Sequence, residues 1–351
     1  MSSGNADRCG YRLERERIDD SSAAEQCDRR VWEDHDRCVW HAPVEGKSLP
    51  TLEEEGELAA GDSLDGAYLA GAVLLGADQF EDASLVGADL VGANLKGADF
   101  TGADLTLADM SDVNGLGADF TGANLEGAVL TKADLRQANL EGARLHETVF
   151  TDATVGAGTS MDDVAVYDRE ATPPDLTRSQ PLEAATWVYR QLQELYRDNG
   201  LAQLARHSYY LEKDARRRLA WKRQNRAEAV KHELSRWVMG YGDSPYRVLG
   251  TALVVIVLFA LLFPLTGGIT ETKDGRALAY VIRHPGDASP WWIGQVFLKS
   301  LYFSIVTFTT LGYGDAQPLT PSVRFLAGFE AVLGAILAAL LVFVLARIVT
   351  W

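Results

Sequence analysis

A five-residue repeat over residues 64–155 constrains the fold of this chain more than any other feature. Leu or Phe returns at almost every fifth position, and Ala usually stands two positions before it. A period of five fits neither an α-helix, with 3.6 residues per turn, nor a β-strand, which repeats every two residues. It does fit a coil with four five-residue sides, in which the large apolar residue and the alanine both point inward. The repeat therefore predicts a β-helix.

Two irregularities interrupt this repeat. After Leu74 the register slips by one residue to Phe80, and at Gly115 the apolar column is broken. We interpret the slip as a bulge and the gap as a loop. The alanine column runs without exception through Ala83, Ala88, Ala93, Ala98, Ala103 and Ala108.

The pattern resembles that of the pentapeptide-repeat family, which implies a right-handed quadrilateral β-helix over residues 62–160. Some members of that family mimic DNA and bind topoisomerases, and an acidic outer face would suit this role. The alternative is a rigid scaffold with a solvated acidic surface, which we favour because a fold alone says little about function. The acidic positions are Asp89, Asp99, Asp104, Asp119 and Asp134.

Residues 309–315 read Thr-Thr-Leu-Gly-Tyr-Gly-Asp and lie between two long apolar runs. A dehydrated K⁺ needs a narrow ring of oxygens, which backbone carbonyls from several subunits can supply. Successive carbonyls face one axis only when alternate residues leave the usual backbone regions, and Gly312 and Gly314 do so at little steric cost. The tetrad Gly-Tyr-Gly-Asp also occurs at 240–243, without the Thr pair. We interpret that copy as a polar turn leading into a membrane.

The two apolar runs are long enough to cross a bilayer. Residues 248–266 form a 19-residue stretch without charge, and residues 325–349 form a second run that contains Glu330. A spanning helix needs about 20 apolar residues. Between the runs we expect a polar loop, about 267–290, and a tilted re-entrant helix over 291–308.

These parts together resemble the two-transmembrane potassium channels over residues 246–351, which implies an all-α two-transmembrane channel pore. The family usually has Val at the position of Leu311, whose side chain points away from the pore, so we expect altered packing and little loss of selectivity. Gly334 matches the usual gating hinge; alternatively, it is a small residue that allows close helix packing. The resemblance assigns filter support to Thr309, Asp315 and Glu330. It assigns K⁺ binding to Thr310, Leu311, Gly312, Tyr313 and Gly314.

One filter per chain implies a homotetramer in contact with membrane lipids. Residues 181–250 carry 13 Lys and Arg against 8 Asp and Glu. The positive-inside rule then predicts a multi-pass plasma-membrane protein with both termini in the cytoplasm. Two alternatives remain open: a nonselective or sodium-permeable channel, and a membrane-tethered interaction scaffold. Aromatic residues suited to the outer membrane interface are Trp291 and Trp292, and those suited to the inner one are Trp237, Tyr241 and Tyr246.

A helical pattern over 181–240 predicts a helical linker before the first span. One helix pair resembles a tetratricopeptide repeat at Tyr189, Leu192, Tyr196, Gly200, Ala205 and Tyr209, and a helical hairpin is the safer interpretation. The basic run that follows would contact anionic lipids, pair with acidic residues of the repeat, or form a solvated face. It comprises Arg216, Arg217, Arg218, Lys222, Arg223 and Arg226.

All three cysteines precede residue 40, and a histidine follows the last of them: Cys9, Cys27, Cys38 and His41. Three thiolates and one imidazole form a tetrahedral structural zinc site, so we predict a Zn²⁺ module over residues 1–48. A cytosolic location and the odd count both argue against disulfides. The spacing from the second cysteine to His41 resembles plant WRC-type modules, whereas the first spacing is longer than theirs. His35 is an alternative ligand, and three unrelated thiols are the alternative to a metal site.

Composition adds limits on function. The net charge is −16, and residues 1–180 hold 14 basic against 36 acidic side chains. This acidity is typical of proteins adapted to a high-salt cytoplasm, and it argues against direct nucleic-acid binding, which needs a basic patch. The histidines show no catalytic or HExxH spacing and no phosphate-binding loop is present, so we do not expect an enzyme. The regulatory ligand or partner, if any, is not readable.

Overall fold

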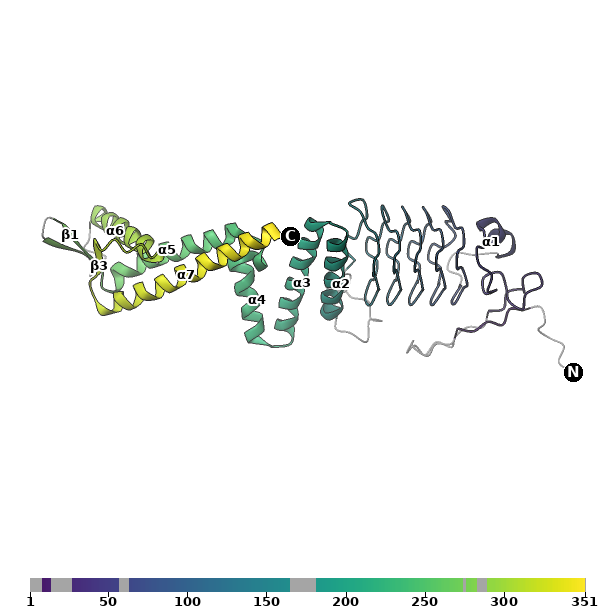
Figure 1. Cartoon of the computed structure of the whole chain (residues 1–351). Helices are drawn as coiled ribbons and strands as arrows, with labels where there is room; N and C mark the ends of the chain where they lie inside the picture. The colour runs from purple at the N-terminus through teal and green to yellow at the C-terminus, as the bar shows by residue number, and fades with distance from the viewer. Residues whose placement is uncertain are drawn as a thin grey trace. The chain divides into compact units, whose positions relative to one another are not determined.

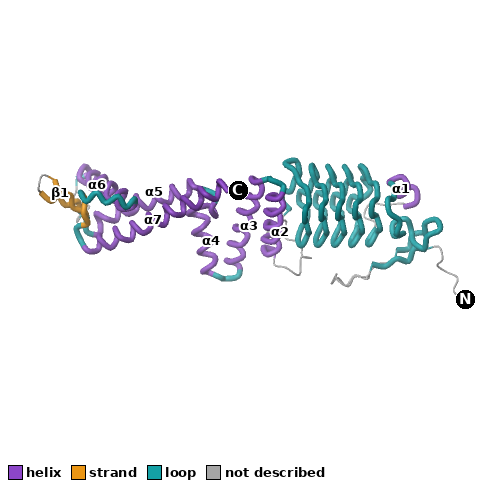
Figure 2. The backbone as a smooth tube through the Cα atoms, viewed as in Figure 1, coloured by secondary structure: helices purple, strands orange, loops and turns teal. Residues whose placement is uncertain are grey.

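The computed structural model describes residues 8–13, 27–56, 63–164, 181–273, 276–282 and 289–350. The chain divides into two compact units, residues 1–225 and 226–351, and each is described separately. Parts of the predicted 1–48 module and of the 267–290 loop lie outside the described residues. Figures 1 and 2 show the β-helix coils of the first unit and the long helices of the second.

The repeat folds into a β-helix. Each five-residue side pairs in parallel with the side about twenty residues later: Asp89 bridges Asp109, which in turn bridges Val129. Central residues such as Leu90 and the preceding alanines such as Ala88 are fully buried. The predicted inward placement of both columns is therefore confirmed.

An aromatic stack runs through the interior of the coils. The rings of Phe80 and Phe100 lie 5.0 Å apart, and those of Phe100 and Phe120 lie 5.4 Å apart, each pair nearly parallel. The edge of Trp40 meets Phe80 at 6.2 Å. Stacked and edge-on aromatic pairs contribute beyond the area they bury, so this column stabilises the centre of the β-helix.

The two irregularities have different outcomes. Sides that pair across the slip are 21 residues apart (Val73 with Asn94), so one extra residue is absorbed there. From Ser84 with Asp104 to Asp134 with Thr154 the paired sides are 20 residues apart. The prediction of a loop at Gly115 is wrong. The N–H of Gly115 donates to the Asp134 carbonyl at 2.9 Å, and the coil continues without a break. The backbone hydrogen bonds hold each side, so a missing central side chain does not interrupt it.

The acidic residues of the repeat hold the turns. The Asp99 carboxylate accepts the N–H of Thr101 at 2.9 Å, and Asp119 accepts that of Thr121 at 2.9 Å. Such bonds to the residue two positions ahead are the usual reason for Asp and Asn in turns. The acidic column therefore has a structural role in every coil where it occurs, which favours the scaffold interpretation.

The N-terminal segment continues the first coil. The N–H of Tyr68 bonds the Trp40 carbonyl at 2.8 Å, and the N–H of Gly46 bonds the Ala70 carbonyl at 2.9 Å. Ser48 pairs in parallel with Val73 just before α1 (Leu49–Gly56). An open β-helix end presents unpaired backbone groups, and this segment covers them.

A helical hairpin follows the coils, as predicted. It consists of α2 (Pro181–Asp198) and α3 (Ala202–Lys222). Between them, the Asn199 amide donates to the Ala153 carbonyl at 2.9 Å and accepts the N–H of Val155 at 3.1 Å. One side chain thus replaces the backbone partners that the last coil would otherwise lack.

Most of the basic run pairs within this hairpin. Arg216 contacts Glu212 at 2.6 Å, and Arg217 contacts Asp214 at 3.1 Å. Arg223 pairs with a glutamate of α2. These acidic partners belong to the helices and not to the repeat, so the predicted pairing with the repeat is not what these contacts show.

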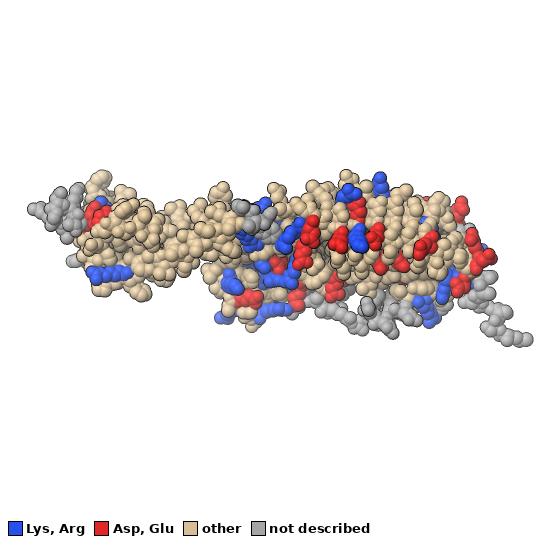
Figure 3. All heavy atoms as spheres, viewed as in Figure 1, with Lys and Arg blue, Asp and Glu red and all other residues tan. Residues whose placement is uncertain are grey.

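The second unit contains four long helices: α4 (Arg226–Met239), α5 (Pro245–Thr266), α6 (Pro290–Phe308) and α7 (Pro321–Thr350). Of the helices described, α5 and α7 are long and apolar enough to cross a membrane. Few charged side chains appear along them in Figure 3. The helix α6 matches the predicted 291–308 segment and packs against both.

A small antiparallel sheet joins the ends of these helices, in the order β2-β1-β3. Its strands are β1 (Ile269–Lys273), β2 (Arg276–Tyr280) and β3 (Ala316–Pro318). The expectation of an all-α pore with a polar loop is therefore corrected. The third strand has only three residues, too few to show an alternating pattern, and it forms because β1 provides a paired edge.

Candidate functional site

Residues 309–315, hereafter the filter segment, begin where α6 ends. The Thr309 hydroxyl bonds the Ile305 carbonyl at 2.7 Å, and the N–H of Leu311 bonds the Val306 carbonyl at 3.0 Å. These bonds use carbonyls of the last helical turn, which have no partner inside the helix. The start of the filter segment is thereby fixed to α6.

The backbone of the filter segment alternates between two conformations. Thr310, Gly312 and Gly314 have φ of 57°, 53° and 78°, whereas Leu311 and Tyr313 do not have positive φ. Alternation between the right- and left-handed regions turns successive carbonyls to the same side of the chain. The sequence predicted this for the two glycines. It gave no signal for Thr310, because a β-branched residue rarely adopts positive φ.

The end of the filter segment is anchored to α6 and to the sheet. The Tyr302 hydroxyl donates to the Asp315 carboxylate at 2.8 Å. The next residue, Ala316, starts β3 and pairs with Glu271 of β1. Sequence analysis did not identify Tyr302, because nothing in the spacing along the chain brings it to Asp315.

A second polar contact ties the sheet to α6. The Glu271 carboxylate accepts from the Lys299 ammonium at 2.8 Å and from the Tyr280 hydroxyl at 3.1 Å. The hydrogen bond from Lys299 lowers the pKa of Glu271. The carboxylate therefore stays charged and paired at neutral pH.

Glu330 of α7 is fully buried between helices. Its carboxyl group contacts the Ser304 hydroxyl, which also donates to the Ile256 carbonyl at 2.8 Å. Residues of α5, α6 and α7 meet at this point. The second oxygen of Glu330 has no partner among the described residues. Glu330 therefore contacts α6 through Ser304, and its support of the filter segment stays a prediction.

Gly334 lies against the last residue of α6. A side chain at this position would place its Cβ less than 3.0 Å from the Phe308 carbonyl oxygen. The close packing of α7 on the end of α6 therefore explains why position 334 is a glycine. The hinge role of Gly334 stays a prediction.

The first Gly-Tyr-Gly-Asp copy is a turn, but it is not a polar one. Gly240–Gly242 form a short 3-10 turn, η2, directly after α4, and Tyr241 is 3% exposed with φ of 60°. Tyr241 is therefore packed within the second unit. Trp237 and Tyr246 are exposed and keep their predicted role at the membrane interface.

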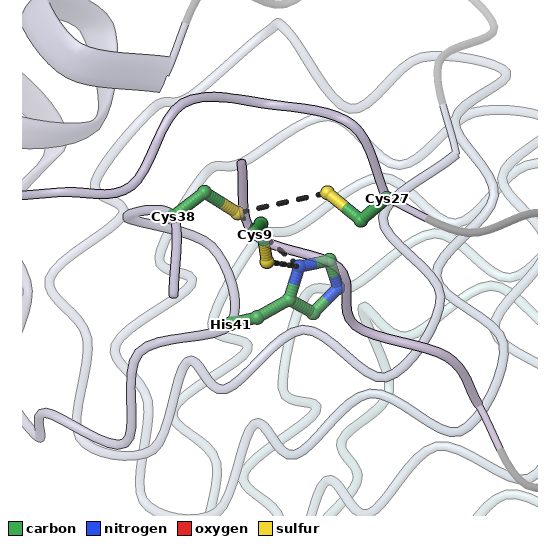
Figure 4. Close-up of side chains that lie close together, drawn as sticks. All are labelled: Cys9, Cys27, Cys38 and His41. Carbon is green, nitrogen blue, oxygen red and sulfur yellow. Dashed lines mark hydrogen bonds between the residues drawn. The ribbon is translucent and has the colours of Figure 1, made fainter. Parts of the chain in front are cut away.

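The cysteines and His41 come together in the first unit, as Figure 4 shows. Their four ligand atoms lie within 4.8 Å of one another. The His41 Nδ1 is 3.2 Å from the Cys38 sulfur and 3.6 Å from the Cys9 sulfur, and the Cys27 and Cys38 sulfurs are 3.8 Å apart. The hydrogen bond from Cys38 lowers the pKa of the Cys27 thiol. His35 instead stacks on Trp32.

The surroundings of the cluster orient its histidine. His41 Nε2 lies 3.1 Å from the Asp65 carbonyl, so this nitrogen carries the proton and Nδ1 presents its lone pair to the sulfurs. The ammonium of Lys47, which is 4% exposed, donates to the Ala42 carbonyl at 2.7 Å. The cluster thus has an imidazole nitrogen directed at its sulfurs, and the buried Lys47 ammonium lies on the segment that follows it.

Comparison with known families matches both halves of the chain. A family model described as ion channel matches residues 269–350. A second, described as pentapeptide repeats, matches eight copies over residues 79–114 and 117–153. The chain therefore combines pentapeptide repeats with an ion-channel segment.

Individual proteins match shorter stretches. The small conductance calcium-activated potassium channel-like protein 3 of Caenorhabditis elegans is 40% identical over 52 residues, which are 15% of this chain and 8% of that protein. The match thus spans less than a tenth of the relative's length.

Among solved structures, a pentapeptide repeat protein of the Arabidopsis thaliana thylakoid lumen is 37% identical, with 30% of this chain and 74% of that chain covered and a TM-score of 0.24. A pentapeptide repeat protein of the cyanobacterium Cyanothece is 24% identical, with 34% and 87% covered and a TM-score of 0.21.

Proposed function

We propose that this chain, in which pentapeptide repeats precede an ion-channel segment, is one subunit of a potassium-selective channel. The observation that carries the proposal is the alternating backbone of the filter segment, with positive φ at Thr310, Gly312 and Gly314. Carbonyl oxygens aligned in this way replace the water shell of K⁺. The carbonyls of Thr310, Leu311, Gly312 and Tyr313 form the ion sites, with Gly314 closing the segment.

The filter segment needs neighbouring chains. In a single chain the side chains of Leu311 and Tyr313 are 57% and 67% exposed, although both are large and apolar. Four copies around one axis cover them and complete the ring of carbonyls, so we propose a homotetramer. Thr309, Asp315 and Glu330 support the filter segment from α6, β3 and α7. In the same proposal Gly334 allows α7 to bend below it.

The proposed topology places α5 and α7 across the plasma membrane and α6 as a re-entrant helix from the outer side. The excess of basic residues over 181–250 supports a cytoplasmic location for the first unit and for both termini. Lipid tails then cover the exposed apolar face of α5, which includes Leu253 and Leu258. Protease added to sealed vesicles of known orientation tests this arrangement.

The channel proposal is tested with the full chain in liposomes under opposed K⁺ and Na⁺ gradients. We expect a reversal potential close to the K⁺ equilibrium value. Gly312→Ala should abolish the flux, because a left-handed conformation costs a residue with a Cβ about 1–2 kcal/mol. Gly250→Ala on α5 is the matched control, since its Cβ would meet nothing within 4 Å. Equal permeability would instead establish a nonselective cation channel. No flux from assembled tetramers would leave the scaffold alternative.

Within the first unit, Cys9, Cys27, Cys38 and His41 are proposed to hold a structural Zn²⁺. Ideal tetrahedral zinc places two sulfurs about 3.8 Å apart, and a sulfur and a nitrogen about 3.6 Å apart. The observed distances of 3.8 Å between Cys27 and Cys38 and 3.6 Å between Cys9 and His41 fit this geometry, and the 3.2 Å between Cys38 and His41 is shorter than the ideal value. With four protein ligands the site has no open position, so its role is structural.

Metal analysis of the purified full chain tests this assignment. We expect one zinc per chain, a loss of zinc in Cys38→Ser, and unchanged zinc in His35→Ala, because His35 lies outside the cluster. A full chain without zinc after purification in the presence of the metal, or a Cys38→Ser variant with full zinc content, would refute the site. Neither result depends on ion conduction.

A further inference from the structure

The first Gly-Tyr-Gly-Asp copy receives a side chain from the far end of the second unit. The Arg347 guanidinium, in the last turn of α7, donates to the Tyr241 carbonyl at 3.1 Å. This carbonyl belongs to η2, the buried turn between α4 and α5. The turn that resembles the filter motif therefore binds a cation of its own chain, through a backbone carbonyl.

Apolar contacts surround this hydrogen bond. Val248 near the start of α5 is 1% exposed, and Val344 of α7 is fully buried against it in the same cluster. Val238 and Met239 at the end of α4 pack on that cluster, together with Ile348. The last two turns of α7 thus pack against residues that precede or begin α5. We call Tyr241, Arg347 and this apolar cluster the inner clasp.

Glycine at position 242 permits the close approach. It has φ of 92°, and an added Cβ would lie 2.8 Å from the Arg347 guanidinium nitrogen and 3.6 Å from the Phe343 ring. A larger residue would therefore push α7 away from the turn. The second glycine of this tetrad is explained by the path of α7 and not by ion binding.

We infer that Arg347 is a positioning residue for the inner end of the pore: by bonding the turn after α4, it holds the end of α7 against its own chain and away from the pore axis. This inference rests on the proposed function, in which four α7 helices surround the conduction path. A helix that is bound to α4 follows the movement of α4. The inner clasp therefore couples the segment before the first span to the width of the inner opening.

The size of the effect follows from the chemistry of the contact. A hydrogen bond that involves a charged group changes an equilibrium constant by about tenfold or more when it is lost. Here the loss frees α7 to move toward the axis, so the closed state gains. The filter segment lies at the other end of the unit and is not touched by Arg347, so its selectivity and unitary conductance should stay the same.

Single-channel recordings of the full chain in planar bilayers test the inference. We expect Arg347→Ala to lower the open fraction by about threefold or more, with unchanged unitary conductance and reversal potential. Arg347→Lys should restore part of the open fraction, because an ammonium can still donate to the Tyr241 carbonyl. Arg324→Ala, at the opposite end of α7, is the matched control and should behave as the unaltered chain.

A double substitution distinguishes loss of the inner clasp from nonspecific destabilisation of the channel. Gly242→Ala should also lower the open fraction, because its Cβ displaces the guanidinium. In the Arg347→Ala background there is no guanidinium for the Cβ to displace. Gly242→Ala should therefore reduce the open fraction less in that background than in the unaltered chain. Only variants that elute as tetramers are compared. An unaltered chain without K⁺ current refutes the channel itself. A conducting chain whose open fraction is unchanged or raised by Arg347→Ala refutes the inner clasp alone.

Discussion

Tyr302 and Asp315 are joined by a 2.8 Å hydrogen bond that spans the filter segment from its supporting helix to its outer end. Between these two residues lie the last turns of α6 and every carbonyl proposed to bind K⁺. The helix thus holds the segment at both ends, through Leu311 at the start and through Asp315 at the finish. The shape of the filter segment depends on this bond because its middle residues have few bonds of their own.

Tyr302→Phe should therefore destabilise the outer end of the filter segment without unfolding the chain. Phenylalanine lacks the hydroxyl that donates to Asp315, and the remaining ring preserves the packing. We expect K⁺ current to decay faster during sustained recording. Tyr246→Phe serves as the control, since Tyr246 is exposed at the start of α5. Equal decay in the two variants would contradict the anchoring role of Tyr302.

Gly334→Ala should destabilise the packing of α6 on α7. Its Cβ would overlap the Phe308 carbonyl, and overpacking of this kind costs about 1–3 kcal/mol. Gly328→Ala, on the same helix, has nothing within 4 Å of the added Cβ and should be neutral. Thermal dissociation of the tetramer measures both. If Gly334→Ala alters gating while dissociating at the unchanged temperature, then the hinge role explains the glycine and the packing role does not.

The pair formed by Glu271 and Lys299 gives a pH dependence with a defined sign. Because Lys299 lowers the pKa of Glu271, the folded chain favours the carboxylate. The stabilisation is then fully present above the ordinary glutamate pKa of about 4.3 and is lost as the pH falls through the lower folded value. We expect K⁺ current to be insensitive to outer pH between about 8 and 5 through this pair, and to change only in stronger acid.

Glu271→Gln isolates that effect. The amide keeps the size of the side chain and removes its charge, so the variant at neutral pH should resemble the unaltered chain in strong acid. The measurement is the current at a series of outer pH values with the inner pH fixed. A change centred near neutral pH that persists in Glu271→Gln would show that another group is responsible.

Zinc removal should loosen the N-terminal end of the β-helix. Protons compete with zinc for its protein ligands, so acid, like a chelator, should release the metal. Trp40 lies between the cluster and Phe80, and we expect its segment to detach from the first coil. Calorimetry of the full chain should then show a lower first transition, restored when zinc is added back. A first transition that is unaffected by metal would contradict this coupling.

The repeat predicts the interior of the β-helix more reliably than its interruptions. The inward columns, such as Ala88 and Leu90, were predictable because one environment repeats in every coil. The extra residue after Leu74 was visible as a shift of the same period. The loop predicted at Gly115 does not form, because the coil is held by backbone hydrogen bonds that glycine also makes.

Contacts between distant segments explain the remaining differences. Tyr302 and Arg347 carry no local signal, since their partners Asp315 and Tyr241 become neighbours only after the helices pack. Thr310 adopts positive φ because the end of α6 and the following glycines fix its neighbours. The same four letters at 240–243 and 312–315 lie in a buried turn and in a filter segment, so the meaning of the tetrad comes from the elements on either side.

The Asn199 amide at one end of the β-helix and the Trp40 segment at the other each bind a particular side of a coil. Between Ser84 and Thr154, each coil repeats the pairing of the one before it at an interval of 20 residues. Whole coils of about twenty residues could thus be inserted or deleted while both ends keep their partners, whereas a change of one or two sides would rotate one end out of register. The length of the β-helix can therefore change by whole coils, and only by whole coils, without disturbing either end.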